Sequence, residues 1–221
     1  MLSRLRSLIT DMGGMVERQV ALACAAVLER DGEAASQAVE SDPAVDRLER
    51  EAEQFVIALL ALRQPMAQDL RHIVAGLKVT GELERIGDYA KNVAKRSIVL
   101  GQFSMPSSLS GLAHMAALVQ ESLKAVIDAW GDSDAEKAVE VWRSDQAIDD
   151  IYNALFRELI TYMMEDPRTI TRSLDIMSIA KAIERVGDHA TNIAQYVVYM
   201  VKGINVRHST AEEIRAQLAN S

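Results

Sequence analysis

The sequence has few of the residues that cross-link small extracellular proteins or interrupt helices. Its 221 residues include a single cysteine, Cys24, and four prolines. One cysteine cannot form an intramolecular disulfide and suits a reducing compartment, and we interpret Cys24 as a small buried hydrophobic residue rather than a reactive thiol. Aromatic residues make up only 5% of the chain. Ala, Leu, Val, Ile, Met and Glu abound instead, which favours helices over sheets.

Long apolar runs and an excess of basic residues are also absent. No apolar run approaches the ~18–20 residues of a transmembrane helix, and the start, "MLSRLRSLITDMGG", predicts the first turns of a helix rather than a signal peptide. We therefore expect a cytoplasmic protein. The net charge of −8, from 24 basic and 32 acidic residues, argues against a nucleic-acid partner, because phosphate binding needs clustered Lys and Arg.

The chain contains a tandem duplication. Residues 84–94, "ERIGDYAKNVA", and residues 184–194, "ERVGDHATNIA", are nearly identical. Upstream the match continues at an offset of 103, where Met12 aligns with Met115 and Asp46 with Asp149. Self-similarity at a fixed offset is typical of repeated structural units. We expect a first repeat over residues 1–100, a linker over 101–110, a second repeat over 111–203, and a C-terminal tail over 204–221 with a short helix near 211–218.

The spacing of apolar residues predicts three helices in each copy. The second helix of the first copy carries a heptad seam at Val45, Leu48, Ala52, Phe55, Leu59 and Leu62. The third begins after Pro65, and its counterpart begins at Pro167. Short connections between long helices imply antiparallel neighbours. The sequence therefore predicts an all-α fold of six long helices, arranged as a tandem pair of antiparallel three-helix bundles related by a pseudo-two-fold.

Pairs of acidic residues four apart recur in both copies. The pairs are Asp42/Asp46 and Glu84/Asp88 in the first copy, and Asp145/Asp149 and Glu184/Asp188 in the second. Such spacing alone is typical of a solvated helix face. However, Leu70, Leu77 and Glu84 lie seven apart, as do Ile170, Met177 and Glu184. We expect these rows to face the core, where a charge is costly unless it is compensated.

The register of the predicted hairpins brings the acidic pairs together. In the first copy, Asp42 with Asp88 and Asp46 with Glu84 are both symmetric about Pro65, which lies in the predicted turn. The corresponding pairs of the second copy are symmetric about the turn at residues 166–167. Antiparallel helices rise equally per residue. Four carboxylates should therefore gather on each bundle.

Clustered carboxylates raise each other's pKa unless arginine, protons or a metal ion compensates them. Without Cys or several His residues, such clusters favour Mg²⁺, Mn²⁺, Ca²⁺ or iron over structural zinc. The competing interpretation is helix capping with arginine pairing, because Ser41-Asp42-Pro43 resembles an N-cap followed by proline. The second copy keeps the aspartate but has Gln146 in place of Pro43. This difference favours the metal interpretation.

Several neighbouring residues are expected to support the clusters. Arg85 and Arg185 are candidate counter-charges, while Asn92 and Asn192 either orient the carboxylates or bridge packed helices. Glycine inside a helix costs roughly 1 kcal/mol relative to alanine. We therefore expect the glycines of the repeated motif, Gly87 and Gly187, to permit close approach of a helix or a ligand. His189 aligns with Tyr89, so we do not expect it to be a ligand shared by both sites.

The repeated motif resembles the PhoU family of phosphate-signalling regulators. The similarity is carried by "ERIGDYAKN", "AIERVGDHATNIAQYVVYMVKG" and "QPMAQDLRHI", and it extends over nearly the whole chain. The resemblance implies the pair of three-helix bundles. It also implies metal clusters, with iron expected first and Mn, Mg or Zn as alternatives, on the eight paired acids Asp42, Asp46, Glu84, Asp88, Asp145, Asp149, Glu184 and Asp188.

The same resemblance implies a function without catalysis. Members act as negative regulators of the phosphate regulon, linking the ATPase subunit of the Pst phosphate ABC transporter to a PhoR-type sensor histidine kinase. We accordingly expect a homodimer at the inner face of the cytoplasmic membrane, attached only through its partners.

Two alternatives remain. The first is a carboxylate-ligated metalloenzyme or metal-storage protein, although di-iron sites of the ferritin kind use Glu-x-x-His pairs and no histidine here has Glu three residues before it. The second is a metal-free helical scaffold.

Overall fold

The computed structural model describes residues 2–63, 65–100, 110–204 and 206, and these residues are almost entirely helical. The helices are α1 (Leu2–Leu28), α2 (Gly32–Arg63), α3 (Ala67–Leu100), α4 (Ser110–Asp132), α5 (Ala135–Glu165) and α6 (Ile170–Lys202), with a 3₁₀ turn, η1 (Pro167–Thr169), before α6. The described segments contain no strand. The prediction of an all-α fold with six long helices is confirmed. The proposed linker, apart from Ser110, and the short helix near 211–218 lie outside the described residues.

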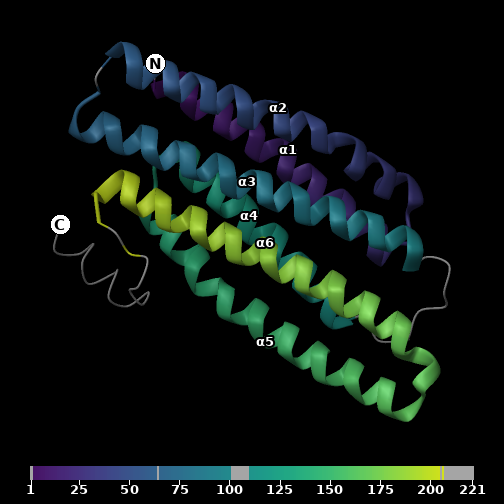
Figure 1. Cartoon of the computed structure of the whole chain (residues 1–221). Coiled ribbons are helices and arrows are strands. Elements are labelled where there is room, and N and C mark those ends of the chain that lie inside the picture. Colours follow the sequence, from purple (N-terminus) through teal and green to yellow (C-terminus); the bar gives the residue numbers. More distant parts are fainter. Residues whose placement is uncertain (1, 64, 101–109, 205, 207–221) are drawn as a thin grey trace.

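The helices form two three-helix bundles that pack against each other (Figure 1). In each bundle every helix contacts the other two: α1, α2 and α3 in the first, α4, α5 and α6 in the second. Helices α3 and α6 run side by side through the middle of the molecule, while α2 and α5 lie on opposite outer sides (Figure 1). Helix α1 also contacts α4. A Cβ added to Gly13 of α1 would lie 3.0 Å from Ile127 of α4, so the glycine permits this close crossing.

Equivalent residues begin the second helix of each bundle. Arg30 and Ser133 adopt left-handed backbone conformations, with φ of 59° and 55°. The aspartate that follows each of them caps the next helix. An Asp31 carboxylate oxygen accepts hydrogen bonds from the Glu33 and Ala34 amides, and Asp134 accepts equivalent bonds at α5. Such caps satisfy amides that have no partner within the helix.

The capping interpretation of Asp42 is therefore wrong. Helix α2 starts at Gly32, ten residues before Asp42, and Pro43 lies inside it. Alanines between these points, including Ala35 and Ala38, are fully buried. Their burial holds the helix together through a position where proline removes a backbone donor. Asp42 is thus free to serve a role other than capping.

The core follows most of the predicted heptad seam of α2. Val45, Ala52 and Leu59 are buried, whereas Leu62 at the end of the seam is 79% exposed. The rows leading to the glutamates are an exception, because Leu70, Leu77 and Ile170 are 39–42% exposed. The expectation that these rows face the core was wrong for these three residues, since others on the same helices, such as Ile73 and Ile176, occupy the core instead. Met177 and Glu184 do lie against or within the packed interior. None of the helices in the described segments has the length and apolarity needed to span a bilayer.

Candidate metal centre and its duplicate

The second bundle brings the predicted carboxylates together most closely. Helix α5 supplies Asp145 and Asp149, and α6 supplies Glu184 and Asp188. Oxygen atoms of Asp149, Glu184 and Asp188 all lie within 4.8 Å of one another, and this is the one such acidic set among the described residues. Oxygens so close together suit a shared hard cation. We call the four residues the second acidic cluster.

Glu184 is the most enclosed member of this cluster. Its residue is 7% exposed, and its buried Oε2 atom has no hydrogen-bond partner in the described chain. A buried carboxylate oxygen without a partner is costly in a folded protein. Binding a cation would remove this cost, so the donor set fits a metal ion.

Gly187 allows α5 to approach α6 at the cluster. A Cβ at this position would lie 3.1 Å from Ile148 Cδ1 and 3.5 Å from Asp145 Oδ1. In the first bundle a Cβ at Gly87 would lie 3.0 Å from Gln19 Oε1. The motif glycines therefore permit close helix packing beside the carboxylates, as the sequence indicated.

Burial and mutual repulsion strain the second acidic cluster. Burial, followed by the charges of Asp188 and Asp149, raises the pKa of Asp145 to about 6, although a hydrogen bond with Thr191 opposes the rise. Burial and the charge of Asp188 also raise the pKa of Asp149. Raised pKa values of this origin mark a place where negative charge exceeds positive charge.

Two basic residues partly neutralise this cluster. The Lys181 ammonium donates to Glu184 Oε1 at 2.5 Å. The Arg185 guanidinium donates to Asp188 Oδ2 at 3.1 Å, and its Nε lies 3.9 Å from Glu184 Oε2. Both side chains are substantially exposed, so the contacts are easily exchanged with solvent. A metal ion would compete with these two side chains for the carboxylates.

The first acidic cluster, Asp42, Asp46, Glu84 and Asp88, has a different arrangement. Lys91 lies between two of its members, with Nζ 2.7 Å from Asp42 Oδ2 and 2.5 Å from Asp88 Oδ1. Burial lowers the pKa of Lys91, but the hydrogen bonds to both carboxylates outweigh this effect and raise the pKa above its ordinary value. An ammonium group thus bridges α2 and α3 here. In the second copy, Thr191 stands at this position.

The rest of the first cluster remains under electrostatic strain. Burial, and then the charges of Asp88 and Glu49, raise the pKa of Glu84 to about 7. Glu49 itself has a raised pKa from burial, Glu53 and Asp46. Glu49 therefore extends this cluster along α2.

The supporting residues divide into two groups. Arg185 contacts the second cluster, whereas no ion pair in the described chain joins Arg85 to the first. The Asn192 amide donates to Glu82 of α3 at 3.1 Å, so it bridges the two bundles and does not orient the cluster. Asn92 lies on a groove between α3 and α6. The nearest signal for Lys91, which the sequence analysis missed, was its mismatch with Thr191 inside otherwise matching motifs.

His189 is not a ligand in this arrangement. Its Nδ1 lies 2.5 Å from Glu82 Oε2 across the α3–α6 interface, and its ring centroid is 5.5 Å from that of Tyr89. Glu82 was also missed from the sequence, because its counterpart in the second copy is Ala182 and the duplication gave no signal there.

Together these features define a class of protein: a duplicated all-α protein with an acidic cluster on each three-helix bundle. Comparison with known proteins agrees with this class. The PhoU domain model matches residues 9–97 and 112–197. The "Phosphate-specific transport system accessory protein PhoU homolog" of Caulobacter vibrioides strain NA1000 / CB15N is 47% identical over 91% of this chain and 88% of its own length.

Solved structures show the same similarity. The crystal structure of PhoU from Pseudomonas aeruginosa is 41% identical, with a TM-score of 0.89 over 92% of this chain and 98% of that one. The phosphate transport system regulatory protein PhoU from Streptococcus pneumoniae is 28% identical, with a TM-score of 0.85 over 93% of this chain and 97% of its own. The chain belongs to the PhoU family. This is a family of accessory and regulatory proteins, not of enzymes, so the metalloenzyme alternative is set aside.

Proposed function

We propose that this protein is a metal-binding adaptor of a phosphate-specific transport system and a negative regulator of phosphate uptake and phosphate-regulon signalling. In this role it links the ATPase subunit of the transporter to a PhoR-type sensor histidine kinase. The names of its relatives, an accessory protein and a regulatory protein of phosphate transport, support the first part. The family resemblance of the repeated motif supports the second.

The observation that carries the metal part is the second acidic cluster. Three carboxylates offer oxygens within 4.8 Å of one another, and a buried oxygen of Glu184 has no hydrogen-bond partner among the described residues. Asp149, Glu184 and Asp188 would hold the ion, with Asp145 beside them. Iron is the first expectation from the family, and Mn²⁺, Mg²⁺ or Zn²⁺ are alternatives, because carboxylates accept several metals and availability selects among them.

As an adaptor, the protein would act by population shift. By binding the kinase in its inactive state while phosphate is being transported, it would increase the fraction of kinase in that state. The chain's own contribution is a rigid pair of bundles whose acidic surfaces carry bound cations. We expect a homodimer positioned at the membrane through its partners.

Metal titration tests the first part of the proposal. Purified protein stripped with a chelator should bind Fe²⁺ or Mn²⁺ saturably in calorimetry, and Asp188→Asn should weaken the binding at least about tenfold. Asp128→Asn is the matched control, since Asp128 is an exposed aspartate of the same bundle that pairs with Lys137. Metal binding that is absent, or equal in wild type and Asp188→Asn, would contradict the metal site.

A binding assay tests the adaptor. The metal-loaded protein should retain the transporter ATPase subunit and the cytoplasmic part of the kinase, each added separately in purified form. Metal-stripped protein and Asp188→Asn should retain less of them if the cation shapes the docking surface. Failure of the loaded protein to bind either partner would overturn the adaptor role while leaving the metal site standing.

A further inference from the structure

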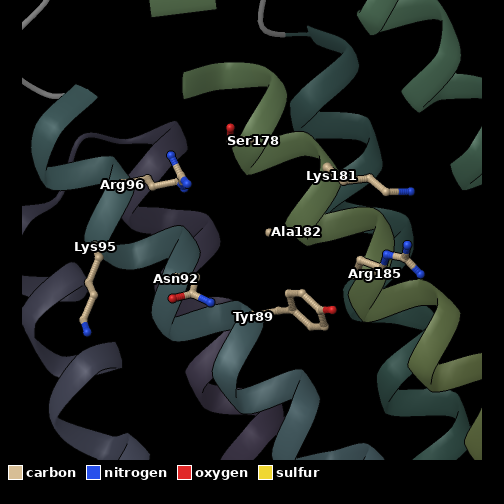
Figure 2. Close-up of a pocket in the computed structure, with 8 residues that line it drawn as sticks. All are labelled: Tyr89, Asn92, Lys95, Arg96, Ser178, Lys181, Ala182 and Arg185. Atoms are coloured by element: carbon tan, nitrogen blue, oxygen red, sulfur yellow. The ribbon is translucent and has the colours of Figure 1, made fainter. Parts of the chain in front are cut away.

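A basic groove lies along the contact between α3 and α6. It has a volume of about 660 Å³. Its lining consists of Tyr89, Asn92, Lys95 and Arg96 from α3 and Ser178, Lys181, Ala182 and Arg185 from α6 (Figure 2). Four of these eight residues are cationic and none is acidic, in a chain whose net charge is −8. The lining of the groove is therefore positively charged, although the protein as a whole is negatively charged.

The duplication supplies an internal comparison for this groove. The equivalent region on the other side of the pseudo-two-fold is filled by side-chain contacts. There, Glu82 contacts His189 and Asn192, and Lys78 lies 5.2 Å from the ring centroid of Tyr196. In the groove, Ala182 replaces Glu82 and Ser178 replaces Lys78. Because Ala182 and Ser178 are small, the groove stays open and has no carboxylate. In the equivalent region, the side chains of Glu82 and Lys78 fill the space.

The two cations that α3 contributes to the groove are only weakly paired. Arg96 lies 3.6 Å from Asp175 and is 48% exposed. Lys95 has no ion pair with any residue of the described chain, and its side chain points away from α6 in Figure 2. Lys181 and Arg185 point away from α3 in Figure 2, and their charged ends contact the second acidic cluster. Lys181 and Arg185 therefore line the groove and also contact the second acidic cluster.

We propose that this groove binds a small anion with more than one phosphoryl group, and that a cation on the second acidic cluster increases its affinity. Binding pockets of 300–1,000 Å³ hold ligands the size of a cofactor, so the volume exceeds the need of a single phosphate ion. Lysine and arginine recognise phosphoryl oxygens by charge and by hydrogen bonds. Tyr89 adds an aromatic ring that points toward α6, and Asn92 adds an amide to the lining (Figure 2).

The coupling rests on the metal binding proposed above. A cation on Glu184 and Asp188 would displace Lys181 and Arg185 from these carboxylates, and both side chains could then turn into the groove. Because linkage is reciprocal, the anion would also strengthen metal binding. The metal ion would bind the carboxylates, and the anion would bind the basic side chains that the metal ion releases.

Calorimetry with inorganic tripolyphosphate at about 0.1 M salt tests the groove itself. Wild-type protein should bind the probe saturably and more tightly than it binds inorganic phosphate. Ala182→Glu, which restores the carboxylate found in the counterpart region, and Lys95→Gln should each weaken binding about tenfold or more. Lys137→Gln removes an exposed lysine elsewhere in the second bundle and should leave the affinity unchanged. No saturable binding, equal affinity in all variants, or equal affinity for phosphate would overturn the proposal.

The coupling can be tested without metal. The double variant Glu184→Gln/Asp188→Asn removes the charges that hold Lys181 and Arg185, and it should bind tripolyphosphate at least about fivefold more tightly. Glu84→Gln/Asp88→Asn makes the same changes at the equivalent positions of the first bundle and controls for net charge. An equal gain in both double variants would reduce the effect to net charge and overturn the coupling.

The two proposals fail in different ways. Without a metal site, the protein would not bind Fe²⁺ or Mn²⁺, yet tripolyphosphate binding and its loss in Ala182→Glu would persist. Without an anion site, metal binding would be normal and the probe would not bind. Lys181→Gln separates them further, because it should weaken anion binding while strengthening metal binding through loss of a competing ammonium.

Discussion

Lys91 and Thr191 occupy equivalent positions, and this difference places an ammonium group between the two helices of the first acidic cluster but a hydroxyl at the same place in the second. Lys91 contributes a positive charge between Asp42 and Asp88. Thr191 is 7% exposed and contributes only a hydroxyl, which hydrogen bonds with Asp145. A metal ion entering the first cluster must displace an ammonium group held by two carboxylates. The duplicated motif thus yields two sites of unequal character, which an alignment of the acidic residues alone did not indicate.

Exchanging these two residues should exchange the metal affinities. We expect Lys91→Thr to add or strengthen metal binding at the first cluster by about tenfold or more, because hydrogen bonds to charged groups contribute about 1.5–3 kcal/mol. Thr191→Lys should weaken binding at the second cluster for the same reason. Elemental analysis and titration would measure both changes. If the reciprocal variants leave the number and affinity of bound ions unchanged, the ammonium is not what separates the clusters.

Asp145 should make the metal-free protein less stable at higher pH. Its pKa in the folded protein, about 6, lies above the ordinary value of 3.8, so the folded state holds this proton more tightly than the unfolded chain does. The free energy of unfolding should therefore fall as pH rises from about 4 through about 6. The groups facing Asp145 are Asp149, Glu184, Asp188 and Thr191, and Lys181 and Arg185 contact two of these carboxylates.

Asp145→Asn isolates this contribution. The variant should be more stable than wild type at pH 8 and close to it at pH 4, because the neutral amide mimics the protonated acid. Urea unfolding of chelator-treated protein at several pH values would measure the difference. A constant difference across the range would show that the substitution acts through packing and not through titration. Saturating metal should reverse the order at pH 8, since it stabilises the ionised carboxylate.

At the scale of the helices, the motif glycines control how closely α5 and α6 approach. Gly187→Val should lower the free energy of unfolding by about 1–3 kcal/mol, because a Cβ already meets Ile148 at 3.1 Å and the added methyl groups force the helices apart. Gly81→Val is the matched control, since a Cβ there meets nothing within 4 Å. Chemical denaturation would compare the two. Equal effects would mean that helix propensity, and not close packing, explains the glycine.

How the helices pair could be predicted from the sequence, but how they begin could not. Symmetry about Pro65 placed Asp42 beside Asp88, and both now contact Lys91. Pro43 misleads, because proline favours the first turn of a helix, whereas α2 starts at Gly32 and tolerates the proline inside it. Asp31 and Ser41-Asp42-Pro43 both resemble the start of a helix in the sequence. Burial of the alanines between them favours the earlier start, and this burial arises only when the bundle is assembled.

The exposure of Leu70 and Leu77 has a similar cause. A seven-residue spacing keeps a row on one helix face but drifts around a straight helix, and the sequence alone does not say which row meets the core. The open groove between α3 and α6 was equally hidden, because it depends on contacts between the two copies. Comparison of the two copies identified functional candidates from the positions that match. Ala182 and Lys91 affect the groove and the first acidic cluster because they differ from their counterparts, so that comparison did not identify them.

For the whole molecule, the extensive α3–α6 and α1–α4 contacts predict that both bundles unfold together. The chain offers a direct test, because both tryptophans, Trp130 and Trp142, lie in the second bundle. The fluorescence of Trp142 reports that bundle, and Trp130, which lines a small cavity with Leu2 and Leu5 of α1, also reports its contact with the first bundle, whereas circular dichroism reports all six helices. Coincident unfolding curves from the two probes would indicate one cooperative unit.

A substitution in the first bundle makes the test decisive. Ile9 is 2% exposed and packs beside Gly76 of α3, within the first bundle. Ile9→Ala should destabilise the protein by about 2–5 kcal/mol. If the bundles are coupled, the urea midpoint of tryptophan fluorescence in the second bundle will fall as far as the midpoint of circular dichroism. A fluorescence midpoint that stays at the wild-type value would instead make the bundles independent. In that case a cation or anion bound at α6 would have no rigid route to the first bundle, and an adaptor would have to signal through each bundle separately.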